Sequence, residues 1–272
     1  MKILITGASG YIGKHIFQCL KKYNPVGTSF TKIELNVSKI HGNNNLQVIN
    51  LLDELEVKRL IQKTKPEIVF HLAGYTNEDH TNKEKELNFD LTRTLINNLD
   101  DNTHVVFLST DKVFNGSIIE PDEFDEPKPK SVYGRQKYEC EKLIKLKCNR
   151  YHIFRLPIVH SFGDSQSRCF IDRAMINLSI GNQVKAFSNV KRSFIRLTKL
   201  LEILELTLSN NRYGIYHAGT SMVSYFERIK NLSEEKNINY QDKLIPCIGQ
   251  VDPLEQGLNT MKVKKIFKVN FE

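Results

Sequence analysis

The chain has 272 residues, of which 40% are hydrophobic and 26% are charged. This composition is ordinary for a folded globular protein, and no stretch approaches the roughly 18 apolar residues that cross a bilayer. The net charge of +8 comes from lysines spread along the chain, and no nucleic-acid recognition motif accompanies them. We therefore expect neither nucleic-acid binding nor membrane association.

The five cysteines are scattered without a CxxC pair, and the eight histidines show no HExxH or similar spacing. We therefore expect reduced thiols, no disulfide framework and no metal site. The apolar run at residues 3–5 precedes a glycine loop and is too short for the core of a signal peptide. We interpret it as the first strand of a cytoplasmic protein.

The first 160 residues alternate short apolar runs with longer helical patterns. Strands are predicted at residues 2–6, 25–28, 46–49, 68–72, 104–109 and 152–156. Helices are predicted at residues 11–22, 53–64, 82–99 and 131–147. This alternation is typical of a parallel sheet with helices on both faces. The continuous apolar runs at 68–70 and 105–108 are expected for central strands buried on both sides.

After about residue 160 the alternation loosens, with helices predicted at 168–180 and 197–209 and only short elements besides. We predict an α/β fold, a Rossmann-type doubly wound parallel sheet with a smaller C-terminal region. Residues 1–160 would form the sheet domain, completed by about 190–225. The remaining segments of 161–272 would form the smaller region over the carboxyl ends of the strands.

Segment 7–13, GASGYIG, directly follows the first predicted strand and opens the first helix. Glycines here allow a tight turn, a close approach to a pyrophosphate and close helix packing. The helix N-terminus then offers free N–H groups to the phosphates. The sheet domain is therefore predicted to bind a dinucleotide through Gly7, Gly10, Tyr11, Ile12 and Gly13. The G-x-x-G-x-x-G spacing resembles the phosphate loop of the extended short-chain dehydrogenase/reductase superfamily.

The end of the second predicted strand bears on cofactor choice. An Asp or Glu there binds the ribose 2′-hydroxyl when NAD is preferred. Segment 26–32, VGTSFTK, has no carboxylate, and the first one to follow is Glu34. Hydroxyls such as Ser29, with Lys32 nearby, suit a 2′-phosphate better, so NADP(H) is favoured and NAD(H) stays open. Leu52, after the third strand, is also assigned to the cofactor site.

Residues with reaction chemistry follow the buried strand at 104–109. Thr110 and Asp111 lie at its carboxyl end, where open parallel sheets bind ligands. Tyr133 and Lys137 are four residues apart on a predicted helix and so share one face. A lysine ammonium favours the phenolate of a tyrosine, whose reference pKa is about 10. We expect Tyr133 to exchange a proton, Lys137 to hold the nicotinamide ribose and Thr110 to polarise a substrate carbonyl.

Longer motifs resemble those of the dTDP-4-dehydrorhamnose reductase family. That family's signature runs S-T-D-Y-V-F-D-G, an acidic and proline-rich loop, then V-Y-G-x-x-K. The chain has STDKVFNG at 109–116, Glu120, EPKP at 126–129 and VYGRQK at 132–137. Further matches are HLAGYT at 71–76, Asn88, RLP at 155–157 and QGLNT at 256–260. The resemblance covers essentially the whole chain and is best between residues 1 and 160.

The resemblance implies a reaction. Hydride would pass from NAD(P)H to C4 of a nucleotide-linked 4-keto-6-deoxyhexose in deoxysugar biosynthesis, and Tyr133 would protonate the new alkoxide. Thr110 and Asp111 match the substrate-side pair of the family. Segment 191–194 resembles one near the substrate in related sugar enzymes, so Arg192 is assigned to the substrate diphosphate. The C-terminal segments would then be the substrate-binding region, and a homodimer is compatible with this assignment.

The resemblance also extends the cofactor site. Ala73, Gly74 and Tyr75 match the segment that lines the cofactor ribose and nicotinamide, and Asn88 on the following helix is placed with them. The cofactor set therefore joins these four residues to the glycine loop, Ser29, Leu52, Tyr133 and Lys137.

Three departures from the family pattern leave the substrate open. Lys112 replaces a tyrosine, HSFG at 160–163 replaces a typical W-V-Y-G, and Leu91 stands where a helix glycine is common. A UDP-linked or 2-acetamido sugar is therefore an alternative to the dTDP sugar. Two other functions also stay open. A sugar-nucleotide epimerase would retain its own NAD, and a non-catalytic regulatory subunit would bind a partner enzyme.

Overall fold

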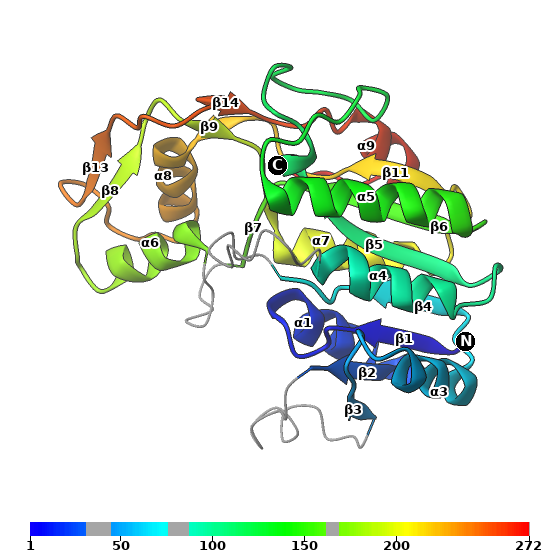
Figure 1. Cartoon of the computed structure of the whole chain (residues 1–272). Coiled ribbons are helices and arrows are strands. Elements are labelled where there is room, and N and C mark those ends of the chain that lie inside the picture. Colours follow the sequence, from blue (N-terminus) through cyan, green and yellow to red (C-terminus); the bar gives the residue numbers. More distant parts are fainter. Residues whose placement is uncertain (31–44, 76–86, 162–168, 272) are drawn as a thin grey trace. The chain divides into compact units, whose positions relative to one another are not determined.

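A computed structural model describes residues 1–30, 45–75, 87–161 and 169–271 (Figure 1). The strands of its central sheet are β1 (Ile3–Thr6), β2 (Val26–Ser29), β3 (Leu46–Val48), β4 (Ile68–His71), β5 (His104–Thr110), β6 (Tyr151–Leu156) and β11 (Gly214–His217). The helices around it are α1 (Tyr11–Cys19), α3 (Glu54–Thr64), α4 (Leu87–Asn97), α5 (Val132–Lys147) and α7 (Leu197–Leu206). The strand order is β11-β6-β5-β4-β1-β2-β3.

The predicted strands are all present, and their ends differ from the prediction by at most one residue. The pairings of β1 with β2 and β4, of β2 with β3 and of β4 with β5 are parallel. β4 and β5 are buried along their whole length, as their continuous apolar runs predicted. The predicted Rossmann-type α/β sheet is therefore confirmed.

The strand order also places the helices. The step from β1 to β2 runs in one direction across the sheet, whereas those from β3 to β4, β4 to β5 and β5 to β6 run in the other. Right-handed crossovers therefore put α1 on one face and α3, α4 and α5 on the opposite face. Figure 1 shows α3, α4 and α5 side by side along the sheet, and α4 contacts both of the others.

Local signals set the helix ends. The Asp53 side chain accepts from the backbone N–H groups of Leu55 and Glu56 and so caps α3. Lys65, in the left-handed region at φ 43°, ends the same helix. Ser131 caps α5, the helix that carries the predicted tyrosine–lysine pair. None of the helices within the described ranges is both long enough and apolar enough to span a membrane.

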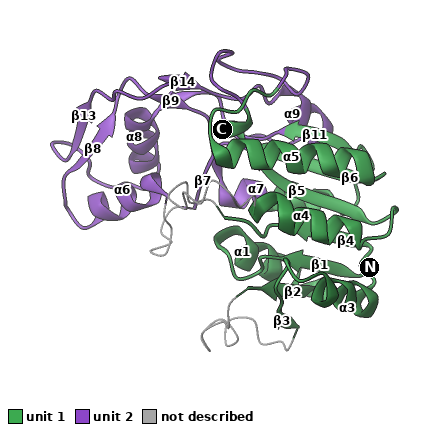
Figure 2. Ribbon diagram, viewed as in Figure 1, with its two compact units in different colours: residues 1–113, 127–155, 201–216 green, residues 114–126, 156–200, 217–272 purple. Residues whose placement is uncertain are grey.

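The chain divides into two compact units (Figure 2). Unit 1 comprises residues 1–113, 127–155 and 201–216 and contains most of the central sheet. Unit 2 comprises residues 114–126, 156–200 and 217–272. The chain therefore passes from one unit to the other several times. The assignment of cofactor binding to the sheet domain and of substrate binding to the C-terminal segments stays a prediction.

Unit 2 is built from short pieces. Its strands are β7 (Ile158–His160), β8 (Val184–Phe187), β9 (Lys191–Arg192), β10 (Phe194–Arg196), β12 (Val223–Ser224), β13 (Leu244–Cys247) and β14 (Glu255–Gln256). They form three small sheets, β10-β7, β12-β9-β14 and β13-β8. Its helices include α6 (Phe170–Ser179), α8 (Tyr225–Glu235) and α9 (Met261–Phe267).

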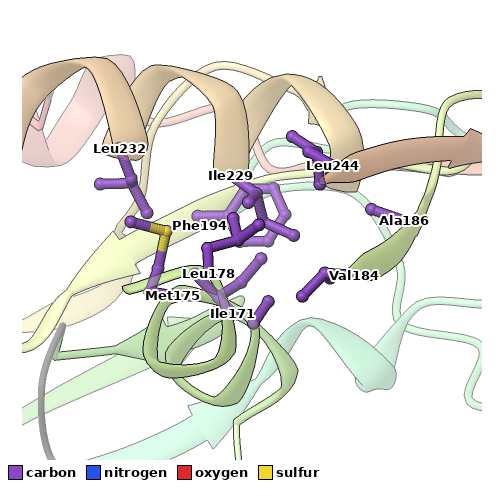
Figure 3. Close-up of a cluster of buried hydrophobic side chains, with 10 residues drawn as sticks. Ile171, Met175, Leu178, Val184, Ala186, Phe194, Ile229, Leu232 and Leu244 are labelled. Atoms are coloured by element: carbon purple, nitrogen blue, oxygen red, sulfur yellow. The ribbon is translucent and has the colours of Figure 1, made fainter. Parts of the chain in front are cut away.

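An apolar cluster holds unit 2 together (Figure 3). Side chains from α6, α8, β8, β10 and β13 meet there: Ile171, Ala174, Met175, Leu178, Val184, Ala186, Phe194, Ile229, Leu232 and Leu244. Phe194 is fully buried, and its ring lies 5.6 Å from that of Tyr225 in an edge-to-face arrangement. Because the strands of unit 2 are short, this cluster rather than a continuous sheet supplies its core.

Candidate active site

A cavity of about 280 Å³ lies in unit 1 beside the glycine loop. Its wall comes from the ends of β1, β2 and β4, from the turn after β3 and from one residue of α4: Gly7, Ser9, Gly10, Thr28, Ser29, Phe30, Ile49, Asn50, Leu51, Leu52, Leu72, Ala73, Gly74, Tyr75 and Leu91. The wall includes seven of the predicted cofactor residues: Gly7, Gly10, Ser29, Leu52, Ala73, Gly74 and Tyr75. The cavity therefore opens at the carboxyl edge of the sheet, where open parallel sheets bind ligands.

The glycine loop packs closely against the neighbouring strand end. Gly7 has φ +68°, and a Cβ on it would lie 2.7 Å from the Ala73 nitrogen. Gly10 is the N-cap of α1 and contributes no side-chain hydrogen bond to the first turn. The first-turn N–H groups are therefore not capped by that residue and suit an anion. Tyr11, Ile12 and Gly13 form this first turn and are not part of the cavity wall.

Two hydroxyls meet at the end of β2. The Ser29 and Ser9 Oγ atoms are 2.8 Å apart and hydrogen-bonded, and both residues line the cavity. Among the described residues of the wall there is neither a carboxylate nor a basic side chain. Lys32 and Glu34, which entered the prediction of cofactor preference, lie outside the described residues. The preference for NADP(H) over NAD(H) therefore stays a prediction.

Lys137 occupies a buried position at the end of β5. Lys137 is only 7% exposed, and its Nζ donates a hydrogen bond to the Leu108 carbonyl oxygen at 2.9 Å. The same Nζ lies 4.5 Å from the centroid of the Phe107 ring and 6.0 Å from that of Tyr133. The structure thus brings the two predicted catalytic residues of α5 together over the carboxyl edge of the sheet.

Burial changes the proton affinity of this lysine. Removal from water lowers the pKa of Lys137 below its usual 10.5, and the nearby Cys140 and Glu141 partly oppose that shift. A lysine with a lowered pKa releases its proton more readily than a surface lysine does. Such a group is suited to proton exchange with a neighbouring phenol.

A glycine fixes the position of Tyr133. The Ser131 Oγ accepts from the Gly134 N–H at 3.0 Å and starts α5 immediately before Tyr133. A Cβ on Gly134 would lie only 2.2 Å from the Lys112 carbonyl oxygen in the 3₁₀ turn η2 (Asp111–Val113). Any larger residue would push the helix away from this turn. The glycine of the VYG motif therefore keeps Tyr133 close to the segment that follows Thr110.

The predicted substrate-side pair is held together. The Thr110 Oγ1 donates to the Asp111 Oδ1 at 3.2 Å and accepts from the Lys112 N–H at 3.2 Å. Thr110 is 7% exposed, so its hydroxyl is fixed at the end of β5. A hydroxyl at this place can donate to a carbonyl oxygen only by turning away from Asp111.

Asn88 positions a backbone segment. Its Nδ2 donates to the Tyr75 carbonyl at 3.0 Å, and its Oδ1 accepts from the Tyr75 N–H at 2.8 Å. A Cβ on Gly74 would lie 2.9 Å from that Oδ1 and 3.6 Å from the Lys137 Nζ. Asn88 thus holds segment 74–75 against Lys137, and these two observations connect the cavity wall with the predicted catalytic lysine. Thr76 lies outside the described residues.

A buried histidine extends this network. His71 Nε2 lies 2.9 Å from Thr92 Oγ1, and its Nδ1 lies 2.8 Å from Thr6 Oγ1. The single proton of the Thr92 hydroxyl goes to the Asn88 carbonyl at 2.7 Å, which assigns the imidazole proton to Nε2. Thr6 then donates to Nδ1 and accepts from the Ala73 N–H at 3.3 Å. Burial lowers the pKa of His71 to about 3, so the ring is neutral near pH 7.

Sequence reasoning assigned no role to Ser9 or Glu141, and it gave His71 only as the first residue of the matched HLAGYT segment. Glu141 was detectable in principle, because it follows Lys137 by four residues and so lies on the same face of α5. Ser9 lies inside the glycine loop but gives no signal of its own. The two hydrogen-bond partners of His71 come from separate elements, Thr6 from β1 and Thr92 from α4, and no spacing in the sequence reveals them.

Arg192, in unit 2, binds backbone carbonyls. Its Nη1 donates to the carbonyls of Lys191 at 2.7 Å and Leu254 at 2.8 Å, and its Nη2 donates to that of Pro253 at 2.8 Å. The guanidinium therefore makes three hydrogen bonds to backbone carbonyls, two of them in segment 253–254. Its predicted contact with a substrate diphosphate stays a prediction. Across the described ranges, no three His, Cys, Asp or Glu side chains are grouped to hold a metal ion.

Known proteins resemble this chain over most of its length. A family model described as the RmlD substrate binding domain matches residues 1–253. The spore coat polysaccharide biosynthesis protein SpsK of Bacillus subtilis (strain 168) is 27% identical over 244 residues, 87% of this chain and 80% of that protein. The methionine adenosyltransferase 2 subunit beta of Danio rerio is 29% identical over 169 residues, 60% of this chain and 49% of that protein.

A solved structure shares the fold. The dTDP-4-dehydrorhamnose reductase from Bacillus anthracis str. Ames, in complex with NADP, superposes with a TM-score of 0.79 at 22% identity. The match covers 97% of this chain and 92% of that one. Since the family model also covers most of the chain, the resemblance inferred from the motifs is confirmed. The chain belongs to the family of the RmlD substrate binding domain.

Proposed function

We propose that the chain is an NAD(P)H-dependent reductase of the C4 keto group of a nucleotide-linked 4-keto-6-deoxyhexose. The observation that carries this proposal is the buried Lys137 at the carboxyl end of β5, with Tyr133 one helical turn before it. Thr110 ends the same strand. Gly74 connects this group to the cavity, since it lines the wall and closely approaches the lysine Nζ.

The residues of unit 1 fit a nicotinamide dinucleotide. The glycine loop and the first turn of α1 would hold the pyrophosphate. Ser9 and Ser29 would bind the ribose of the adenosine half, and segment 73–75 would line the ribose next to the nicotinamide. A reduced nicotinamide bound there supplies the hydride. The NADP complex of the structural relative from Bacillus anthracis supports this assignment.

Tyr133, Thr110 and Lys137 have different roles in the proposed proton transfer. The Tyr133 hydroxyl gives its proton to the substrate oxygen as negative charge develops on it. The Thr110 hydroxyl turns from Asp111 and donates a hydrogen bond to the same oxygen. The Lys137 ammonium stabilises the phenolate that remains, and its buried surroundings strengthen this attraction. Because burial lowers the pKa of Lys137, the lysine can then return a proton to Tyr133.

The residues proposed to face the substrate are compatible with a sugar nucleotide but do not identify which one. Asp111 lies next to Thr110 and would bind sugar hydroxyls, and Arg192 is the candidate for the diphosphate. Lys112 stands beside this pair where the family has a tyrosine, which favours testing UDP-linked and 2-acetamido sugars with the dTDP sugar. The polysaccharide role in the name of the Bacillus subtilis relative is consistent with an activated sugar substrate.

A sugar-nucleotide epimerase is the second candidate within the same chemistry. It would use the same Tyr133 and Lys137 but regenerate its cofactor in each cycle. Such an enzyme retains NAD through purification, whereas a reductase exchanges it. The cofactor content of the freshly purified protein therefore separates the two functions.

A non-catalytic subunit is the candidate from a different class. The match to a methionine adenosyltransferase subunit, over 60% of this chain, favours it. The arrangement of Thr110, Tyr133 and Lys137 argues against it, because a protein without turnover does not need a buried lysine beside a tyrosine. Capture of an abundant enzyme partner, together with no oxidation of NADPH, would favour the subunit.

The test is the loss of reduced-nicotinamide absorbance when the protein meets dTDP- and UDP-linked 4-keto-6-deoxyhexoses, with NADPH and NADH compared. Rapid oxidation with one sugar would support the reductase and identify its nucleotide and cofactor. Binding of NADPH without oxidation across the whole panel would contradict it. In that case the epimerase is tested next, by measuring whether the protein interconverts nucleotide sugars without added cofactor.

A further inference from the structure

A buried ionic cluster lies behind the proposed catalytic residues of unit 1. The Ser109 Oγ donates to the Glu141 Oε1 at 2.5 Å. The Arg155 guanidinium, on β6, donates to the same carboxylate at 2.8 Å from Nη2 and 3.1 Å from Nε. Ser109, Glu141 and Arg155 are 4%, 1% and 2% exposed. The mechanism above uses none of these three groups.

The cluster and Lys137 each form a hydrogen-bonded link between α5 and the end of β5. Lys137 bonds to the Leu108 carbonyl, and Glu141, one helical turn later, bonds to the Ser109 side chain. Helix residues four apart therefore bond to consecutive strand residues. The next residue of the strand is Thr110. A slide or rotation of α5 would break both links at once, so together they fix the helix along and around its axis.

We propose that Glu141 is a positioning residue, which through Ser109 and Arg155 fixes the helix bearing Tyr133 and Lys137 against the strand ending in Thr110. This role presupposes the reductase function proposed above. A purely stabilising role explains the cluster less well, since desolvation offsets most of the attraction within a buried ion pair. A tenth of a nanometre in the placement of a catalytic group, by contrast, changes a rate strongly.

The charge of Glu141 has a second effect, on the proton affinity of Lys137. The titratable groups that face Lys137 are Tyr133, Cys140 and Glu141 on α5 and the neutral His71 on β4. The carboxylate opposes the lowering of the Lys137 pKa by burial. If the ammonium is the active form, the rate falls as the pH rises through its pKa. Removal of the carboxylate should therefore move the loss of activity to lower pH.

The experiment compares three variants of the full chain. Ser109→Ala removes the link to the strand and leaves the Glu141–Arg155 pair intact. Glu141→Gln keeps a hydrogen-bond acceptor and removes the charge. Ile144→Ala is the matched control, because Ile144 is a fully buried residue of the same helix that makes no part of the cluster. The measured quantities are the midpoint of thermal unfolding, the NADPH dissociation constant by fluorescence, and kcat and KM as functions of pH.

We expect Ser109→Ala to lower kcat about tenfold with the sugar KM unchanged, as expected for one lost hydrogen bond to a charged group. Its NADPH dissociation constant should rise about threefold, because a displaced Lys137 binds the ribose next to the nicotinamide less well. Glu141→Gln, if it folds, should also shift the alkaline loss of activity to lower pH. Ile144→Ala should lower the unfolding midpoint and leave kcat and NADPH affinity within twofold.

Two outcomes would overturn the positioning role. One is a Ser109→Ala protein with kcat and NADPH affinity within twofold of the original chain. The other is an Ile144→Ala control that loses as much kcat and NADPH affinity as the Ser109→Ala protein does. If the original chain oxidises no NADPH with any sugar, the proposed function fails. The NADPH affinity of Ser109→Ala still decides the positioning role in that case, since a threefold loss supports it and an unchanged value overturns it.

Discussion

Buried polar side chains have different partners in the two units. In unit 1 two groups of them bond to one another near the carboxyl edge of the sheet. Glu141 joins Ser109 to Arg155, and His71 bridges Thr6 and Thr92. These contacts connect separate strands and helices through side chains alone.

In unit 2 several buried or half-buried polar side chains satisfy the backbone, although the buried Arg228 and His160 side chains bond to each other. The Arg192 guanidinium donates to three carbonyls, two of them in segment 253–254. The Asp172 carboxylate accepts from the Ser161 N–H at 3.0 Å, and the Glu123 carboxylate accepts from the His217 N–H at 2.8 Å. Each of these contacts holds a segment at or beyond the end of a strand.

The difference follows from the size of the sheets. In the seven-stranded sheet neighbouring strands satisfy one another's backbone groups, so the polar side chains are available to fix one another. The strands of unit 2 have two to four residues, and buried backbone groups beyond their ends need side-chain partners. Substitutions of polar residues should therefore affect chemistry in unit 1 and stability in unit 2.

The largest expected effect is in unit 1. Tyr133→Phe removes the proposed proton donor, so we expect kcat to fall about 1000-fold, within the usual range for a general acid. The NADPH dissociation constant should stay within twofold, because Lys137 still binds the ribose. Tyr138→Phe, on the same helix, is the control and should keep its kcat. Turnover of the Tyr133→Phe protein at the original rate would rule out the proposed mechanism.

Acid should destabilise the folded chain by the next largest amount. Burial lowers the pKa of His71, His152 and His160 to about 3 and that of His104 to about 4. The unfolded chain, with histidine pKa values near 6.5, therefore binds more protons below that pH, and stability falls as the pH falls. The loss between pH 8 and pH 6 is about 0.8 kcal/mol for each histidine, or roughly 3 kcal/mol together.

Urea unfolding followed at several pH values measures this loss. His71→Gln should flatten the dependence by about a quarter, whatever its effect on stability at pH 8. An unfolding free energy that stays constant from pH 8 to pH 6 would show that the four histidines protonate equally well in the folded chain. His71 would then not be a neutral link between Thr6 and Thr92 in unit 1.

The fold of unit 1 could be predicted because its strands and helices alternate regularly and its central strands are continuous apolar runs. The apolar runs at 68–70 and 105–108 mark β4 and β5, and the four-residue spacing places Tyr133 and Lys137 on one face of α5. In unit 2, strands such as β9 and β12 have only two residues, which no periodicity can reveal. The Ser109–Glu141–Arg155 cluster joins residues 32 and 14 positions apart, and this separation reflects the tertiary fold rather than any local rule.

A smaller effect is expected for Arg192 in unit 2. Arg192→Met removes its hydrogen bonds to the carbonyls of Lys191, Pro253 and Leu254, so we expect the free energy of unfolding to fall by about 2 kcal/mol. The kcat at saturating substrate should stay within threefold. Arg173→Met, at an exposed position on α6, is the control and should leave stability unchanged. An Arg192→Met protein of unchanged stability whose sugar KM rises at least tenfold would show that Arg192 binds the substrate. A polar side chain of unit 2 would then affect chemistry rather than stability.

The smallest effect tests the comparison most directly, because the same substitution is made in both units. Ser131 caps α5 in unit 1, and Ser224 caps α8 in unit 2 through a capping box with Glu227. Replacement of either serine with alanine should cost about 1 kcal/mol of unfolding free energy. Only Ser131→Ala should also lower kcat, about threefold, since the first turn of α5 carries Tyr133. Equal losses of kcat in both variants would show that activity follows overall stability and not the placement of this turn.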